Sequence, residues 1–280
     1  MPLKVGAHVS IAGSLDLAID RAAAIGADCI QIFGSAPQSW RPFIFPLDQL
    51  ESFNRKRKEF QIGPVFLHAI YLINLASSNP FILGNSIASL DQYLKFGKAI
   101  GSAGVIFHTG SHGGRGFTTV ADQVAEALRQ ILAREGIGSL LIENSAGAGG
   151  IIGGKFAEIG ALMKAVNSPR LAVCLDTAHA LESGYEIRTK EGLDKTLDEF
   201  DREIGLERLA VVHANDSKTA LGSNRDRHEN IGEGEIGIEG FRRIVNHPAL
   251  RDLPLIIETP GFGGKGPDLD NIEVLRNLAH

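Results

Sequence analysis

The chain has 280 residues, of which 44% are hydrophobic and 22% charged, so it can bury a large core as one large α/β domain or two small ones. Its formal net charge of −5 excludes the broad basic face with which proteins coat nucleic acid, so any nucleic-acid binding must be local. No stretch approaches the roughly 18 apolar residues of a membrane span, and the first residues lack the pattern of a signal peptide, so we expect a soluble, unprocessed protein.

Eight short apolar runs recur along the chain and are predicted to be β-strands. They are rich in Val, Ile, Leu and Phe and nearly continuous rather than alternating, which is typical of parallel strands buried on both faces. In chain order they span residues 4–10, 29–33, 64–69, 104–110, 139–144, 171–177, 209–216 and 254–259.

Helical patterns separate these runs, with apolar residues at helical spacing and glycine at several helix ends. Clear examples span residues 14–26, 47–60, 88–104 and 120–136. A strand followed by a helix, eight times over, predicts an α/β fold of the (β/α)8 TIM-barrel type, with residues 1–280 forming a single domain. A doubly wound open sheet is the alternative.

Two cysteines, Cys29 and Cys174, lie inside apolar runs that are predicted to be strands. Buried free thiols are common in that setting, whereas a secretory disulfide framework is not. We therefore expect a reducing, intracellular and cytoplasmic location.

Glycine-rich stretches follow three of the predicted strands, at residues 145–155, 232–237 and 261–266. None of them joins two separate cores, so we interpret them as long loops on the catalytic face of the barrel. The stretch at 232–237 is also a candidate for binding a phosphate through its backbone N–H groups.

Polar side chains of metal-binding type end seven of the eight runs, and a polar residue at this end of a barrel strand indicates function more than packing. The second run is the exception. The seven residues are His8, His68, His108, Glu143, Asp176, His213 and Glu258.

Further ligand types lie in the adjoining loops. His179 follows Asp176 by three residues, and Asp226 precedes His228 by two, so that in extended backbone both side chains of the second pair point the same way. Imidazole and carboxylate ligands without cysteine suit Zn²⁺, with Mn²⁺ or Fe²⁺ as alternatives. The nine candidate metal ligands are His68, His108, Glu143, Asp176, His179, His213, Asp226, His228 and Glu258.

With these residues the chain resembles a known family, the zinc-dependent apurinic/apyrimidinic (AP) endonucleases of the endonuclease IV type, over essentially its full length. The motifs that carry the resemblance are HAIYLINLA at 68–76, FHTGSH at 107–112, IENSAG at 142–147, CLDTAHA at 174–180, HANDSK at 213–218 and DRHENIGEGEIG at 226–237.

The resemblance implies a site for three zinc ions per chain. The first ion would be held by His68, His108 and Glu143. The third ion would be held by His179, Asp226 and His228. The second would be held by Glu143, Asp176, His213 and Glu258. Glu143 would bridge the first two ions and also act in catalysis by orienting or deprotonating the attacking water. His8 and His112 match family positions that support ligands or phosphate.

The resemblance also implies contacts to duplex DNA with abasic or 3′-blocked lesions. The loop at 34–40 would enter the DNA at the lesion, although Gln38 stands where the family usually has arginine, and Tyr71 keeps the aromatic side chain that the family inserts into the base stack. Other candidate contacts are Trp40, Arg41, Lys218, Arg225 and Arg227.

We therefore expect a monomeric DNA repair enzyme that cuts 5′ to abasic sites, leaves a 3′-hydroxyl, and trims blocked 3′ ends. A divalent-metal sugar isomerase or epimerase on a similar barrel is the alternative, but it has no need of a third metal site. A lesion-binding protein without catalysis would be expected to have lost a metal ligand, and this chain has lost none.

Overall fold

Eight parallel strands close into a barrel in the computed structural model, which describes residues 3–41, 43–134 and 138–280. Around the barrel the strands follow the order β1-β10-β7-β6-β5-β4-β3-β2. Their bounds are Val5–His8 (β1), Ile30–Phe33 (β2), Val65–His68 (β3), Gly104–Phe107 (β4), Leu140–Glu143 (β5), Leu171–Asp176 (β6), Leu209–His213 (β7) and Leu255–Ile257 (β10). Val5 of β1 pairs with Leu255 of β10, so the sheet has no free edge. The predicted TIM barrel is confirmed, and the open sheet is excluded.

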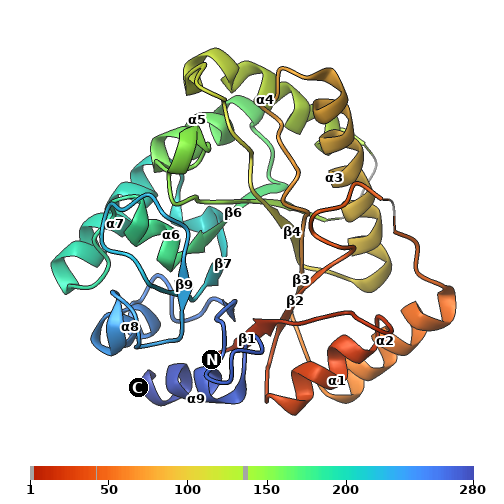
Figure 1. Cartoon of the computed structure of the whole chain (residues 1–280), viewed down its shortest axis with the longest axis vertical. Coiled ribbons are helices and arrows are strands. Elements are labelled where there is room, and N and C mark those ends of the chain that lie inside the picture. Colours follow the sequence, from red (N-terminus) through yellow and green to blue (C-terminus); the bar gives the residue numbers. More distant parts are fainter. Residues whose placement is uncertain (1–2, 42, 135–137) are drawn as a thin grey trace.

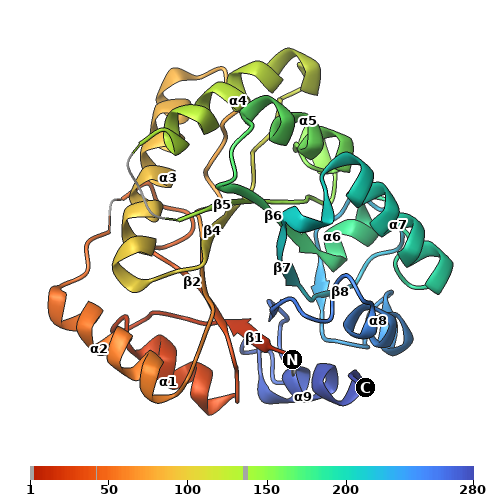
Figure 2. The ribbon, with the colours of Figure 1, turned by 180° about the vertical axis from the view of Figure 1, so that it is seen from behind.

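Helices form an outer ring around these strands, and α9, which ends near the C-terminus, lies beside β1 (Figures 1 and 2). The α-helices are Leu17–Ala24 (α1), Leu47–Glu59 (α2), Pro80–Ile100 (α3), Phe117–Leu132 (α4), Phe156–Val166 (α5), Thr177–Glu182 (α6), Lys190–Glu203 (α7), Gly237–Asn246 (α8) and Leu269–Leu278 (α9). Two short 3₁₀ turns are Ala148–Gly150 (η1) and Leu206–Arg208 (η2). In the described ranges, none of the helices combines the length and apolar character needed to cross a membrane.

The start of α3 differs most from the sequence prediction, because the helix begins eight residues before residue 88. Asn79 caps it by accepting a hydrogen bond from the N–H of Phe81, and Pro80 takes the first turn, where no N–H is required. Gly84 and Asn85, which are weak helix formers, hide this turn in the sequence pattern. The predicted end of the fourth helix, residues 135–136, lies outside the described residues.

Two apolar layers stabilise the barrel. The larger layer packs between strands and helices and includes Val65 and Leu67 of β3. The smaller lies inside the barrel, because its residues alternate along the strands with those that face the helices. The inner layer consists of Cys29, Phe66, Ile106, Leu141, Cys174, Val211 and Ile256. Both cysteines are free and fully buried, as predicted, and burial raises the pKa of each thiol to about 12.

A small antiparallel hairpin follows β7 and was not predicted. Its strands are Asp216–Ser217 (β8) and His228–Glu229 (β9), and residues 218–227 connect them. The hairpin lies over the mouth of the barrel next to α6, which it contacts closely. It therefore brings a segment late in the sequence back to the ends of β6 and β7.

Candidate functional site

The polar side chains of the site occupy one ring at the mouth of the barrel, two residues beyond the inner apolar layer. Because side chains alternate along a strand, a residue two positions after an inward-facing one also faces inward. His68 thus follows Phe66, and Glu143 follows Leu141. The ring consists of His8, Gln31, His68, His108, Glu143, Asp176, His213 and Glu258, one residue from each of the eight strand segments. Beyond it opens a cavity of about 890 Å³.

His68, His108 and Glu143 form the first cluster. The ligand atoms of all three lie within 4.8 Å of one another. His68 donates its Nδ1 hydrogen to the carbonyl of Ala69 at 2.7 Å, which leaves the lone pair of Nε2 facing Glu143 Oε2 at 3.1 Å. Nε2 of His108 approaches the same oxygen at 3.4 Å. Two imidazole nitrogens that converge on one buried carboxylate oxygen need a proton or a cation between them and the oxygen.

Glu143, Asp176, His213 and Glu258 form the second cluster, again with ligand atoms within 4.8 Å. His213 donates from Nε2 to Gln31 Oε1 at 2.7 Å, and its Nδ1 faces Glu143 Oε1 at 3.0 Å, Glu258 Oε2 at 3.5 Å and Asp176 Oδ2 at 3.8 Å. A single proton on Nδ1 cannot satisfy three carboxylates. Sequence reasoning missed Gln31 because it lies within an apolar run rather than at its end.

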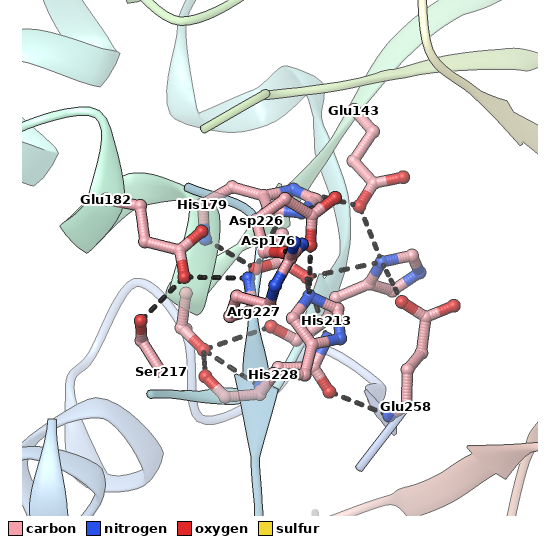
Figure 3. A network of polar contacts seen from close by, with 12 residues as sticks. Glu143, Asp176, His179, Glu182, His213, Ser217, Asp226, Arg227, His228 and Glu258 are labelled. Atoms are coloured by element: carbon pink, nitrogen blue, oxygen red, sulfur yellow. Dashed lines mark hydrogen bonds and ion pairs between the residues drawn. The ribbon is translucent and has the colours of Figure 1, made fainter. Parts of the chain in front are cut away.

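Glu143 is shared by both clusters and is 1% exposed. Burial alone would raise the pKa of this carboxyl, but the facing imidazoles of His108 and His213 hold it well below its ordinary value. His179 also approaches Glu143, with its Nδ1 at 3.4 Å from Oε1. The carboxylate is therefore approached by four imidazoles, of which His179 and His213 are labelled with it in Figure 3.

The third set of predicted ligands consists of His179, Asp226 and His228. In the structure these three residues are divided between two clusters. His179 Nε2 lies 3.4 Å from Asp226 Oδ2, and His228 Nε2 lies 3.7 Å from the other oxygen of Asp226. Asp176 joins His179 and His228 in one cluster, whereas Glu182 joins His179 and Asp226 in the other. Glu182 was missed because it lies beyond the motif at 174–180, and only the helical turn of α6 sets it beside His179.

Buried polar atoms without a hydrogen-bond partner are concentrated here. Among the described residues, three of these atoms belong to the third set and its neighbour: His179 Nε2, His228 Nε2 and Glu182 Oε2. Since buried polar groups are nearly always paired, such a concentration indicates a site built for a ligand. The nitrogen and carboxylate donors fit divalent cations of the Zn²⁺, Mn²⁺ or Fe²⁺ type.

The glycine-rich segment at 232–237 does not present its N–H groups to the cavity. Four of its backbone N–H groups donate instead to the buried carboxylate of Asp216, from Gly232, Gly234, Ile236 and Gly237 at 2.9–3.2 Å. The expectation that this segment binds a phosphate is therefore wrong. Its role is to hold Asp216, which begins the hairpin.

Tyr71 lines the cavity, whereas Gln38 lies outside it. The Tyr71 side chain is 58% exposed, and its ring packs edge-on against Phe33 and His68. Its backbone N–H donates to the carbonyl of Pro37, which ties this loop to the loop that carries Gln38. Gln38 is exposed near the tip of its loop.

The other candidate DNA contacts fall in two places. Trp40 and Arg41 border a separate small pocket beside α3, where Trp40 packs against the core. Lys218, Arg225 and Arg227 are exposed on the hairpin and its connecting loop, next to Asp226 and His228. The hairpin thus places three positively charged side chains beside the acidic and imidazole groups at the mouth of the barrel.

Comparisons with known proteins cover nearly the whole chain. The profile of the xylose isomerase-like TIM barrel family matches residues 19–278. A probable endonuclease 4 from Halothermothrix orenii is 40% identical over 276 residues, covering 98% of this chain and 99% of the relative. A probable endonuclease 4 from Haloarcula marismortui is 38% identical over 263 residues, covering 94% of each chain.

Solved structures also match the chain over nearly its whole length. The crystal structure of endonuclease IV from Thermus thermophilus matches with a TM-score of 0.85 and 37% identity, covering 98% of each chain. A D-tagatose 3-epimerase-like protein matches with a TM-score of 0.75, but at 19% identity this likeness shows the fold alone.

Proposed function

Because the chain belongs to the endonuclease IV family, we propose that it is a DNA repair endonuclease acting on duplex DNA with abasic or 3′-blocked lesions. It hydrolyses the phosphodiester bond 5′ to an abasic site and leaves a 3′-hydroxyl and a 5′-deoxyribose phosphate. The same site trims blocked 3′ ends, and the enzyme acts as a monomer.

The observation that carries this proposal is the position of Glu143. Its two oxygens face imidazoles from different clusters, Oε2 toward His68 and Oε1 toward His213, inside the mouth of a large cavity. A carboxylate shared in this way can bridge two cations. Two bridged cations are the arrangement used for in-line displacement at phosphorus.

Three zinc ions per chain fit the available donors, with Mn²⁺ or Fe²⁺ as substitutes. When bound, they would supply Lewis-acid activation of water and phosphate and neutralise charge on the leaving 3′ oxygen. The first would be held by His68, His108 and Glu143, and the second by Glu143, Asp176, His213 and Glu258. The third would be held by His179, Asp226 and His228.

Side chains of the protein position the attacking water and the imidazole ligands. Glu143 is ionised at neutral pH, so it can accept a hydrogen bond or a proton from a water molecule that enters the cavity. The hydrogen bond from His213 to Gln31 fixes the imidazole so that Nδ1 faces the carboxylates. The carbonyl of Ala69 does the same for His68, whose Nε2 faces inward.

The cavity suits a nucleotide that has left the base stack. An abasic nucleotide lacks the stacking that opposes extrusion, so a pocket reached only by extrusion selects it without reading sequence. Tyr71, exposed at the rim, is placed to stack on a neighbouring base. Gln38 enters the lesion without the charge of an arginine.

Phosphate contacts come from the surrounding surface, where they fix the position of the duplex and dominate affinity. These contacts are confined to a few residues, as expected for a chain whose net charge is −5 and which has no broad basic face. The residues proposed for them are Trp40, Arg41, Lys218, Arg225 and Arg227.

A sugar isomerase or epimerase would use the same barrel, and the epimerase-like neighbour shares the fold. The additional donors beside the Glu143 clusters, His179, Asp226 and His228, favour the nuclease, because a sugar isomerase needs no third site. The relatives at 38–40% identity over 94–98% of the chain favour it as well.

Incubation with a duplex that contains one tetrahydrofuran abasic analogue tests the proposal. We expect a single nick 5′ to the analogue, loss of the nick with a strong chelator, and recovery on adding Zn²⁺. An undamaged duplex of the same sequence is the control and should remain intact. Absence of a zinc-dependent nick at the analogue would overturn the proposed function.

A further inference from the structure

Glu182 is a fully buried carboxylate at the end of α6, one helical turn after His179. Its Oε1 accepts hydrogen bonds from Ser217 Oγ at 2.6 Å, from the backbone N–H of Arg227 at 3.1 Å and from Thr219 Oγ1 at 3.2 Å (Figure 3). These donors come from the end of β8 and from both ends of the segment that connects β8 and β9. Through these hydrogen bonds, one carboxylate oxygen holds together the two ends of the loop that carries Asp226.

The backbone of α6 supports the same loop. The N–H of Asn224 donates to the carbonyl of Glu182 at 2.8 Å, and the N–H of Gly222 donates to the carbonyl of Leu181 at 2.9 Å. Helix and loop thus form one unit that carries His179 on one side and Asp226 on the other. Glu182 is fixed between them.

The second oxygen of Glu182 has a different environment. Oε2 is buried without a hydrogen-bond partner, and a Glu182 oxygen lies within 4.8 Å of ligand atoms of His179 and Asp226. Nε2 of His179 is also buried without a hydrogen-bond partner. The buried carboxylate oxygen of Glu182 and the buried imidazole lone pair of His179, with the more exposed carboxylate of Asp226 beside them, repel one another unless a cation lies among them. The three hydrogen bonds on Oε1 leave Oε2 as the donor atom for that cation.

We propose that Glu182 is a protein ligand of the third cation, acting through Oε2 together with His179 and Asp226. It does not belong to the ligand set that the family resemblance implies, and the inference rests on the three-ion site of the proposed function. A second carboxylate adds negative charge at this ion. It is therefore expected to hold the ion more tightly than Asp226 and the two histidines alone.

Glu182→Gln separates ligation from loop support. The amide oxygen can still accept hydrogen bonds from Ser217, Thr219 and Arg227, whereas the NH₂ that replaces Oε2 cannot bind a cation. Ser217→Ala is the matched control, because it removes one hydrogen bond to Oε1 and leaves Oε2 unchanged. Glu239→Gln, with a side chain 66% exposed on α8, controls for the loss of one negative charge.

Zinc content and affinity are measured in each folded protein by elemental analysis and by competition with a chromophoric chelator, after thermal melts establish folding. We expect three ions in the unmodified protein and at least about 10-fold weaker binding of one ion in Glu182→Gln, since even groups that only support a ligand contribute that much. Both controls should bind as the unmodified protein does. Glu182→Asp, which keeps a carboxylate, should bind the third ion more tightly than Glu182→Gln.

Three ions bound with equal affinity by Glu182→Gln and the unmodified protein would overturn the role of Glu182 and leave the proposed function standing. Equal weakening by Glu182→Gln and Ser217→Ala would also overturn it, because loop support alone would then explain the effect. Fewer than three ions in the unmodified protein would overturn the three-ion site and with it the role of Glu182, whereas the nicking assay tests the proposed function separately.

Discussion

Glu143→Gln is expected to lower the rate of nicking at an abasic analogue by on the order of 10³-fold or more. The substitution keeps the shape of the side chain but removes the charge that faces His68, His108 and His213. It also replaces one oxygen donor by an NH₂ that cannot bind a cation. A loss of 10³ corresponds to about 4 kcal/mol of transition-state stabilisation.

Single-turnover nicking of the tetrahydrofuran duplex measures this effect, and a binding assay with the same duplex shows whether affinity changes. Glu126→Gln is the matched control, because this glutamate has a side chain 70% exposed on α4. We expect it to nick at the unmodified rate. A Glu143→Gln rate within 10-fold of the unmodified enzyme would contradict a central role for this carboxylate.

Gly6→Ala is expected to destabilise the barrel strongly. Gly6 of β1 pairs with Ile256 of the inner layer, and a Cβ added at Gly6 would lie 1.8 Å from the carbonyl oxygen of Cys29, the residue before β2. Backbone atoms of a paired strand cannot move aside as a flexible side chain can. We expect a loss of at least about 3 kcal/mol, because overpacking costs typically 1–3 kcal/mol and more when the neighbour is rigid.

Differential scanning calorimetry or circular dichroism measures the change as a fall in Tm of roughly 10 °C. Gly263→Ala is the matched control, since a Cβ at Gly263 would meet no atom within 4 Å. It should leave Tm unchanged. A Gly6→Ala melting temperature equal to that of the control would show that β1 and β2 are not packed as described.

Much of the barrel and of the polar ring could be predicted because strand periodicity is local. Once Phe66 is assigned to the inside of the barrel, His68 must face inward too, and the same step relates Leu141 to Glu143. Gln31 obeys this rule but lies inside its apolar run, where the prediction, based on the ends of the runs, did not reach. Counting two residues from Cys29 would have found it.

The remaining features depend on contacts between distant segments. Glu182 joins His179 and Asp226 because residues 217–227 return to α6, a contact that spans 45 residues between Glu182 and Arg227. The N–H groups of Gly232 and Gly234 are taken by Asp216 in the same way. Local sequence patterns carry no information about such pairings, so a glycine-rich segment resembled a phosphate site.

Zinc stoichiometry of the purified protein tests the central claim most directly. We expect about three zinc ions per chain by elemental analysis after removal of free metal, because the Glu143 clusters take two and the set at His179, Asp226 and His228 takes the third. A value of about one ion per chain would contradict the three-ion site and favour a sugar isomerase or epimerase on the same barrel.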